Sequence, residues 1–182
     1  MLKKVIVEII VAFFPKSKRA ELRYILRNYG NFLYVKHTAQ KLGKNFRCGE
    51  NILITKNTII GNDVTINGIQ VQGHGELFIG NHCVIGSELL AITSTHEYES
   101  DRLPFGKEYR NKPVVIGDCC WLGSRVTLLP GTELAEGCIV QAGAVVHGKF
   151  PAGSIIGGNP AIAFKSRDME NYNRNKENHS YK

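Results

Sequence analysis

The second half of the chain carries aliphatic residues at a fixed spacing of six. The members of this row are Ile116, Leu122, Leu128, Leu134, Val140 and Val146. Small residues directly follow several of them, as at Gly117, Gly123 and Ala135. This spacing fits neither the period of an amphipathic helix nor the two-residue alternation of a half-buried strand. It predicts short strands whose aliphatic residue points inward, separated by turns that small residues permit.

The same spacing runs through the first half, with one shift of phase. The positions that keep it are Ile54, Ile60 and Ile66 before the shift and Ile79 and Ile85 after it. Three six-residue units make one triangular coil, and residues eighteen apart then stack at strand spacing, about 4.8 Å. Ile116 should lie over Leu134, and Cys120 over Cys138, inside the prism. The sequence therefore predicts an all-β fold, a parallel β-helix over residues 43–167.

The segments that flank the repeat are predicted to be a cap and a tail. Stacked coils leave unpaired strand edges at their ends, and proteins cover such edges. Residues 1–42 should form an N-terminal helical capping segment, in which Arg19–Asn28 covers the first coil. Residues 168–182 are polar and charged, and we expect them to be disordered. The length of 182 residues favours one domain around one core.

The repeat stops between Thr93 and Lys112. This stretch is polar and charged and contains Pro104 and Gly106, which predicts a loop outside the prism. Long loops on rigid scaffolds usually carry function. His96 lies near the start of this loop, and histidine is the side chain best suited to move protons at neutral pH. His96 is therefore the leading candidate for a general base.

Charge is concentrated in the first part of the chain. The net charge is +7, and residues 1–47 hold eleven Lys and Arg against two Glu. No zinc-finger spacing or aromatic-rich RNA-binding motif accompanies this basic region, so we do not expect nucleic-acid binding. The apolar run Val5–Phe14 is short, contains Glu8 and precedes no cleavage site, which argues against a signal peptide or a membrane span. Packing on the domain or on another subunit, and peripheral contact with a membrane, both remain open for this run.

The cysteines do not indicate a disulfide framework or a metal site. The chain has five, an odd number, and none of them forms a CxxC pair. This usage fits a reducing cytoplasm. No neighbour that would activate Cys119 or Cys120 as a nucleophile is evident, so we expect the cysteines to fill the core as small apolar residues.

Three motifs together resemble the hexapeptide-repeat acetyltransferases. They are THEY in the loop, the run KPVVIGDCCWLGSRVTLLPGTELAEGCIVQAGAVV, and GGNPA. The resemblance covers roughly residues 43–167 and is greatest to the maltose, galactoside, nodulation-factor, and capsule or lipopolysaccharide O-acetyltransferases. It implies a left-handed β-helix, a homotrimer with active sites between subunits, and acetyl-CoA-dependent transfer to a sugar or surface-glycan hydroxyl. We expect no metal to be needed. The cysteine usage and the basic, apolar N-terminal segment together predict work in the cytoplasm, at the inner membrane surface if that segment touches lipid.

The resemblance also suggests roles for individual residues. His96 matches the catalytic histidine of the family, and Glu97, Glu99 or Asp101 would orient it or remain solvated charges. Asn67 lies near the family's active-site asparagine after a one-residue shift, so it is either an oxyanion donor or a turn residue. The expected coenzyme A contacts are Trp121, Gly123, Ser124, Ala142 and Gly143 along the pantetheine groove, with Lys149, Lys165 and Arg167 at the phosphates. Ile162 departs from the pattern, because relatives often carry a basic residue there.

Other functions stay open at this point. An amino sugar or an antibiotic would make the protein an N-acetyltransferase or an antibiotic acetyltransferase. The γ-class carbonic anhydrases share the fold and bind zinc through histidines, here His74, His82 and His96, but the loop lacks their second histidine. A non-catalytic β-helix module would not need the loop histidine. Serine acetyltransferases carry a much longer helical segment before their coils.

Overall fold

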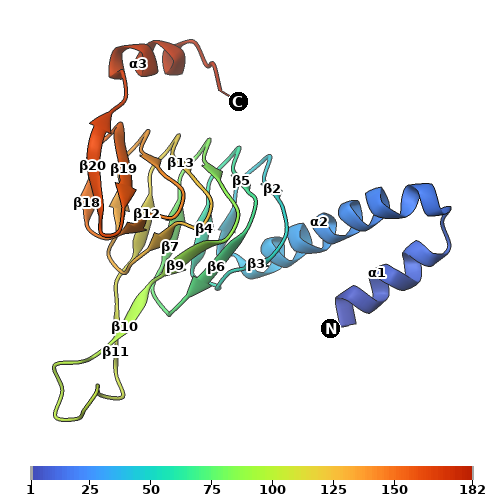
Figure 1. The fold of residues 1–182 in the computed structure, drawn as a ribbon, viewed down its shortest axis with the longest axis horizontal. Coiled ribbons are helices and arrows are strands. Elements are labelled where there is room, and N and C mark those ends of the chain that lie inside the picture. Colours follow the sequence, from blue (N-terminus) through green and yellow to red (C-terminus); the bar gives the residue numbers. More distant parts are fainter. Residues whose placement is uncertain (1, 182) are drawn as a thin grey trace.

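Short parallel strands wind into a three-sided prism in the computed structural model, which describes residues 2–181 and the side chains of residues 5–181 (Figure 1). Face 1 consists of β1 (Lys41–Leu42), β4 (Thr58–Ile60), β7 (Leu77–Ile79), β12 (Val114–Ile116), β15 (Glu133–Leu134) and β18 (Lys149–Phe150). Face 2 consists of β2 (Arg47–Cys48), β5 (Thr65–Ile66), β8 (Val84–Ile85), β13 (Trp121–Leu122), β16 (Ile139–Val140), β19 (Ser154–Gly158) and β20 (Ala161–Ser166). Face 3 consists of β3 (Ile52–Leu53), β6 (Ile69–Gln72), β9 (Leu89–Ile92), β14 (Thr127–Leu128) and β17 (Val145–Val146).

The strands follow one another around the prism in the order face 1, face 2, face 3. The chain therefore turns at three edges, which we call corner 1–2, corner 2–3 and corner 3–1 after the faces that they join. The predicted ladders are present, because Ile116 pairs in register with Leu134, and Leu122 with Val140. The shift of phase is also explained: Ile60 pairs with Ile79, so that coil is longer than eighteen residues. The prediction of an all-β parallel β-helix with a helical cap and an external loop is confirmed.

The interior is filled by the aliphatic row and by three cysteines. Cys83, Cys120 and Cys138 are buried, and the Sγ of each lies 3.1–3.3 Å from a backbone carbonyl of the next coil. The prediction that the cysteines fill the core is correct for these three. Cys48 is only half-buried, but it packs against the core in the first coil. The prediction is wrong for Cys119, which is half-buried at corner 1–2 with a φ of 55°, a conformation that turns its side chain out of the strand alternation.

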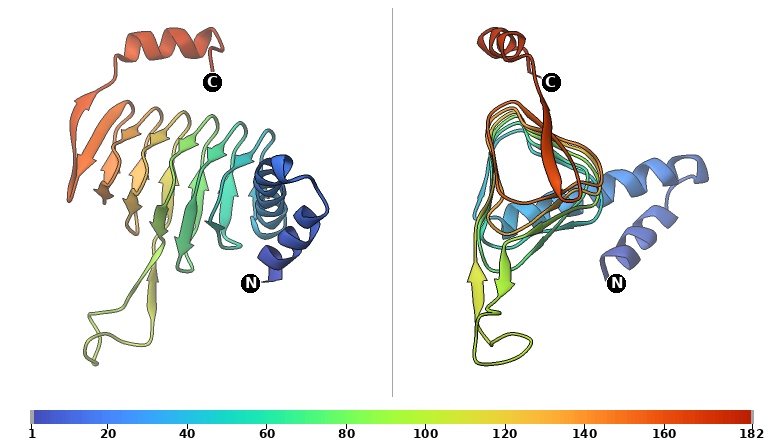
Figure 2. Two further views of the ribbon diagram at one scale, coloured as in Figure 1. Left: turned by 45° about the vertical axis from the view of Figure 1, so that its right-hand side comes forward. Right: turned by 60° about the vertical axis from the view of Figure 1, so that its left-hand side comes forward.

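The N-terminal segment is a helical hairpin that projects from the first coil (Figures 1 and 2). It consists of α1 (Leu2–Ala12), the short 3-10 helix η1 (Lys16–Lys18) and α2 (Arg19–Thr38). The predicted helix Arg19–Asn28 exists but continues to Thr38, and it is this continuation that caps the prism. Val35 is fully buried there, and the Tyr34 hydroxyl donates a hydrogen bond to the Ile54 carbonyl at 2.9 Å. No helix in the described part of the chain combines the length and apolar character needed to cross a bilayer.

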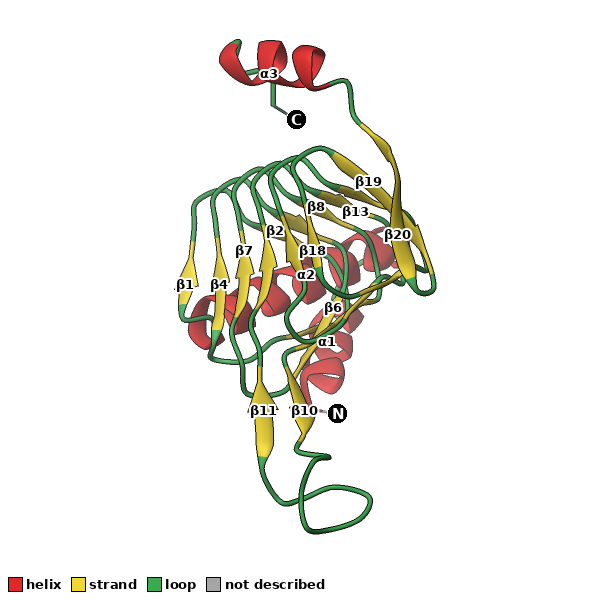
Figure 3. Cartoon of the chain, turned by 90° about the vertical axis from the view of Figure 1, so that its left-hand side faces the viewer, coloured by secondary structure: helices red, strands yellow, loops and turns green. Residues whose placement is uncertain are grey.

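The C-terminal segment contains a helix where the sequence predicted disorder. α3 (Met169–Glu177) begins at Asp168, whose side chain accepts a hydrogen bond from the Asn171 backbone N–H at 2.9 Å. The ring of Tyr172 is buried and its hydroxyl lies 2.7 Å from the Glu136 carboxylate, so α3 is held over corner 1–2. Figure 3 shows α3 on the side of the prism opposite the long loop.

Candidate functional site

The loop of residues 93–112 leaves the prism at corner 3–1 as a two-stranded ribbon. Its strands are β10 (Ser94–His96) and β11 (Tyr109–Asn111), which pair antiparallel (Figure 1). The root of the ribbon is fixed to the coils. The Thr93 hydroxyl donates to the Gln72 carbonyl at 3.0 Å, and the Ser94 hydroxyl donates to the Asn111 side chain at 2.6 Å. The predicted external loop therefore starts from a rigid base.

His96 lies at the end of β10, half-buried between two aromatic rings. The ring centroid of Phe105 lies 3.8 Å from that of His96, and the Tyr109 centroid lies 4.5 Å away. Nδ1 of His96 is buried, and no group in the described part of the chain is hydrogen-bonded to it. Nε2 is the nitrogen that remains accessible. The geometry buries one imidazole nitrogen and leaves the other at the surface.

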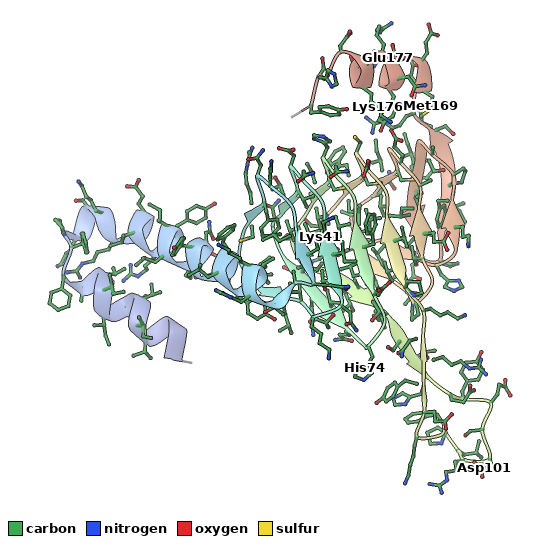
Figure 4. The ribbon with its side chains drawn as sticks, turned by 180° about the vertical axis from the view of Figure 1, so that it is seen from behind. Lys41, His74, Asp101, Met169, Lys176 and Glu177 are labelled. Carbon is green, nitrogen blue, oxygen red and sulfur yellow. The ribbon has the colours of Figure 1, made fainter. Side chains whose placement is uncertain are left out.

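The acidic residues of the loop do not contact His96 among the interactions of the described chain. Glu97 forms an ion pair with Arg110 across the ribbon, and this hydrogen bond lowers the pKa of its carboxyl group. Glu99 and Asp101 are exposed, and Figure 4 shows Asp101 at the tip of the loop. No contact among the described residues supports the hypothesis that one of these acids orients His96. Glu97 stabilises the ribbon instead, through its ion pair with Arg110.

The expected pantetheine contacts lie together at corner 2–3. Ser124 is on this corner, and its hydroxyl lies 3.1 Å from the Ser87 hydroxyl in the coil before it. Ala142 and Gly143 occupy the same corner in the next coil and are exposed; a Cβ on Gly143 would meet no atom within 4 Å. The close stacking of the coils also requires glycine at position 123, because a Cβ there would lie 2.6 Å from the Ala142 backbone nitrogen. This corner therefore presents an exposed surface of small residues.

Trp121 lies beside this surface, and Asn67 lies on the same corner. Trp121 is 56% exposed on face 2, in the row between Val84 and Ile139. Asn67 is exposed at corner 2–3, directly after β5. His96, by contrast, extends from corner 3–1. Within one chain the structure therefore gathers Asn67 with the cofactor residues and does not bring it to His96.

The three expected phosphate contacts lie in different surroundings. Lys165 is exposed on face 2, in register with Ile155. Arg167 donates a hydrogen bond to the Gly137 carbonyl at 3.2 Å and covers the Tyr172 ring at 4.9 Å, so it helps to hold α3. Lys149 lies on face 1, with Nζ 2.8 Å from the Glu133 carboxylate. The structure places Lys165 and Arg167 near each other and Lys149 apart from both.

Lys165 and Arg167 line a groove of 510 Å³ between face 2 and the C-terminal segment. Arg47, Lys176 and Tyr172 also line it, and none of them was singled out from the sequence. Arg47 follows the register of face 2, so the repeat could have predicted its place. Lys176 and Tyr172 were missed because α3 was taken for disordered chain.

Within one chain, the three histidines of the carbonic-anhydrase hypothesis lie at two different corners. His82 lies on corner 1–2, stacked on Tyr181 with ring centroids 3.9 Å apart. His74 and His96 both lie close to Tyr109 at corner 3–1. Among residues 2–181, no group of three or more His, Cys, Asp or Glu side chains is arranged to hold a metal ion.

Comparison with known proteins gives the family. The model named "Bacterial transferase hexapeptide (six repeats)" matches residues 113–148. WcaF of Escherichia coli K12, a protein named for acetyl transfer in colanic acid biosynthesis, is 31% identical over 166 residues, which are 87% of this chain and 81% of WcaF. WbbJ of the same species, named for O-acetyl transfer in lipopolysaccharide biosynthesis, is 27% identical over 154 residues, 80% of this chain and 76% of WbbJ.

Solved structures agree on the fold. The hexapeptide-repeat acetyltransferase VCA0836 of Vibrio cholerae superposes with a TM-score of 0.66 at 23% identity, covering 91% of this chain and 88% of that one. A galactoside acetyltransferase in complex with coenzyme A gives a TM-score of 0.60 at 19% identity, covering 93% of this chain and 83% of that one. The stacked coils, the projecting histidine loop and the extent of the match to WcaF show that this chain is a member of the hexapeptide-repeat acetyltransferase family.

Proposed function

We propose that this protein transfers the acetyl group of acetyl-CoA to a hydroxyl of a sugar or surface glycan, with His96 as general base. The observation that carries this proposal is the accessible Nε2 of His96 on a loop that extends from one corner, while an exposed surface of small residues runs along another. A base and a thioester groove are the two parts that direct acyl transfer to an alcohol needs.

The proposed chemistry is a single displacement. Acetyl-CoA supplies the acetyl thioester. Nε2 of His96 takes the proton of the acceptor hydroxyl while the oxygen attacks the carbonyl carbon, a contribution of about 10²- to 10⁴-fold in rate. The tetrahedral oxyanion is stabilised by the side-chain amide of Asn67 or by backbone N–H groups at the corners. His96 then returns its proton to the departing sulfur.

The residues proposed to contact coenzyme A suit the chemistry of its pantetheine arm. Trp121, Gly123, Ser124, Ala142 and Gly143 offer an exposed aromatic ring and small side chains to an extended apolar arm. Lys165 has no partner among the interactions of the described residues, so it is free to meet a phosphate. Arg167 would have to give up its contact with Gly137 to do so, and Lys149 its ion pair with Glu133. No metal has a role in this proposal.

The complete site lies between subunits in this proposal. His96 and the groove belong to different corners of one prism, so the histidine loop of one chain serves the groove of a neighbour. A closed cyclic trimer satisfies this arrangement three times over, because every subunit then both gives a loop and receives one.

The proposed acceptor is a capsule or lipopolysaccharide sugar. WcaF and WbbJ are named for colanic acid and lipopolysaccharide biosynthesis. The N-terminal hairpin adds exposed apolar residues to a basic segment, which suits contact with the anionic inner surface of the cytoplasmic membrane. Polymeric and lipid-linked glycans are built at that surface, so the enzyme would act in the cytoplasm beside it.

The activity is tested by incubating the protein with acetyl-CoA and a panel of free sugars, amino sugars and surface glycans. Mass spectrometry of each product distinguishes an ester from an amide. Replacing His96→Ala should lower transfer by at least about 10²-fold and leave coenzyme A affinity nearly unchanged. Amide products on amino sugars would establish N-acetyl transfer instead, and near-normal transfer by His96→Ala would rule out the proposed base.

The location of the site between subunits is tested by mixing two inactive chains. His96→Ala removes the base, and Ala142→Trp fills the groove at an exposed position. After subunit exchange, a 1:1 mixture should regain about a quarter of wild-type activity, because every hybrid trimer has one of its three interfaces intact and about a quarter of the trimers are inactive homotrimers. No regain in hybrids of confirmed composition would mean that each site lies within one chain.

A further inference from the structure

Four rings form a continuous row from the prism to the middle of the loop. His74 belongs to the turn between β6 and β7, Tyr109 to β11, His96 to β10, and Phe105 to the loop beyond. The His74 ring meets Tyr109 edge to face, with centroids 5.3 Å apart and planes at 84°. Figure 4 places His74 at the root of the loop, on the coil itself.

Phe105 and Tyr109 enclose the imidazole of His96. The planes of Phe105 and His96 are inclined by 17°, and those of Tyr109 and His96 by 35°. Two rings this close to the imidazole centroid cannot share one of its faces, so they lie on opposite faces. Tyr109 is also the direct cross-strand neighbour of His96 in the ribbon, which fixes its position from the backbone.

His74, the ring of the row nearest the prism, is held by two hydrogen bonds of its backbone. The backbone N–H of His74 donates to the Ser94 hydroxyl at 2.7 Å, and the carbonyl of His74 accepts a hydrogen bond from the Asn57 side chain, also at 2.7 Å. His74 is therefore tied both to the loop root and to the coil below. A ring packed against it cannot shift without disturbing the coils.

A general base needs a fixed ring direction, because the accessible nitrogen must face the hydroxyl. This direction is commonly set by a hydrogen bond to the second imidazole nitrogen. Within the described residues Nδ1 of His96 has no such partner, and Glu97 is committed to Arg110. The rings on both faces of the imidazole restrict its rotation in place of that hydrogen bond.

We infer that Phe105 and Tyr109, supported by His74, are positioning residues that hold the His96 imidazole in its reactive direction. This inference rests on the proposed role of His96 as the base. The three residues touch His96 or one another, and none of them is given a part in the chemistry. Loss of either flanking ring should let the imidazole turn, which lowers the fraction of the time that Nε2 faces the acceptor.

The kinetic test replaces each flanking ring. Phe105→Leu and Tyr109→Leu should each lower kcat about tenfold and leave the KM for acetyl-CoA nearly unchanged. Phe105→Tyr and Tyr109→Phe keep the rings and should restore kcat. The matched control is Tyr98→Leu, which removes an exposed ring from the same loop; Tyr98 lies under the Arg110 guanidinium at 5.1 Å and has no ring contact with His96.

The geometry is tested separately by proton NMR of protein labelled at histidine. Resonances of the His96 ring, assigned by their absence in His96→Gln, should lie upfield in the wild type because both flanking rings shield them. Phe105→Leu should remove part of that shift. An unshifted His96 in the wild type would overturn the inference, whatever the variants do.

The outcomes separate this inference from the proposed function. If His96→Ala is inactive but Phe105→Leu and Tyr109→Leu turn over normally, the positioning role is wrong and the base stands. If His96→Ala itself retains activity, the proposed function fails first. Leu variants that lose coenzyme A affinity and thermal stability together with kcat, with no recovery in the ring-keeping variants, would show a purely structural loop contact and contradict the inference.

Discussion

Lys149 and Glu133 are in-register neighbours on face 1, and their charged groups lie 2.8 Å apart. Lys165 occupies face 2 without such a partner. A cation that is already paired has less to gain from a phosphate, since it must first give up its carboxylate. The two lysines, both expected from the family motif to meet phosphate, should therefore behave differently.

We predict that Lys165→Ala weakens coenzyme A binding about fivefold, equivalent to about 1 kcal/mol for an exposed charged contact. Lys149→Ala should leave the Kd unchanged within error. Isothermal titration at low and high salt checks both, and the effect of Lys165 should shrink as salt screens it. A larger loss in Lys149→Ala would mean that this lysine reaches the cofactor of a neighbouring subunit.

Cysteine reactivity should differ between the three buried thiols and the two half-buried ones. Cys48 and Cys119 are half-buried, and burial raises the pKa of both thiols. A raised pKa keeps them protonated near neutral pH, and the thiolate is the reactive form. We predict slow labelling of these two by Ellman's reagent, faster as pH rises, and no labelling of the other three until the protein unfolds. Peptide mapping identifies which cysteines are labelled, and a label on any of the other three in the native protein would contradict the prediction.

Cys119→Ala should retain acetyl transfer, because the single displacement uses no enzyme nucleophile. Retained fold with lost transfer, or an acetyl group found on Cys119, would replace direct attack by an acetyl-enzyme pathway.

Docking of α3 should depend on the charge of Glu136. Its carboxylate receives hydrogen bonds from Lys176 at 2.5 Å and from Tyr172 at 2.7 Å, and the Lys176 contact foremost lowers the pKa of Glu136 below its usual 4.5. A lowered native pKa stabilises the docked state fully above the usual value. That stabilisation is lost as pH falls through the lowered pKa, so α3 should loosen below about pH 4.5.

At neutral pH, Glu136→Gln should raise amide exchange in residues 169–177 by up to about fivefold, the range of a largely exposed ion pair. Exchange in the coils should not change. Glu133→Gln is the control, since it also removes a paired carboxylate but lies on face 1. Equal protection of α3 in both variants would show that the ion pair adds nothing to docking.

The sequence was most informative where the structure repeats. A spacing of six fixes both the inward direction of Leu122 and its stacking on Val140, because each coil copies the one before it. The same logic placed Ser124 and Ala142 on one edge. His96 stood out because it begins the stretch where the repeat stops.

What the sequence did not show depends on contacts across the repeat. The length of α2 is decided by Val35 packing on the first coil, and the order of α3 by Tyr172 packing on Gly137. Neither contact follows the six-residue spacing, so neither could be predicted from it. The enclosure of His96 also left no sequence signal, because Phe105 and Tyr109 meet His96 only once the loop has folded back on itself as a ribbon.

The N-terminal hairpin exposes a further apolar surface, for which we propose a lipid partner. Val11 is fully buried where α1 packs near α2, yet Ile9 is 57% and Phe13 is 85% exposed. A helix of eleven residues is only about 16 Å long, too short to span a bilayer but suited to lie on one. Lys16 and Lys18 follow directly, next to the apolar residues. This combination favours an anionic lipid surface over a neutral one.

We predict that the protein co-sediments with vesicles containing phosphatidylserine or phosphatidylglycerol and much less with pure phosphatidylcholine. Ile9→Glu combined with Phe13→Glu should reduce this binding at least about tenfold, because each apolar side chain contributes about 1.5–3 kcal/mol when buried. Ile162→Glu, at an exposed apolar site on β20, should bind as the wild type does. Light scattering decides between lipid and protein as the partner. If the double variant changes the molar mass of the assembly and not its vesicle binding, α1 is an interface between copies of the chain, because charge on a buried subunit contact would separate the subunits.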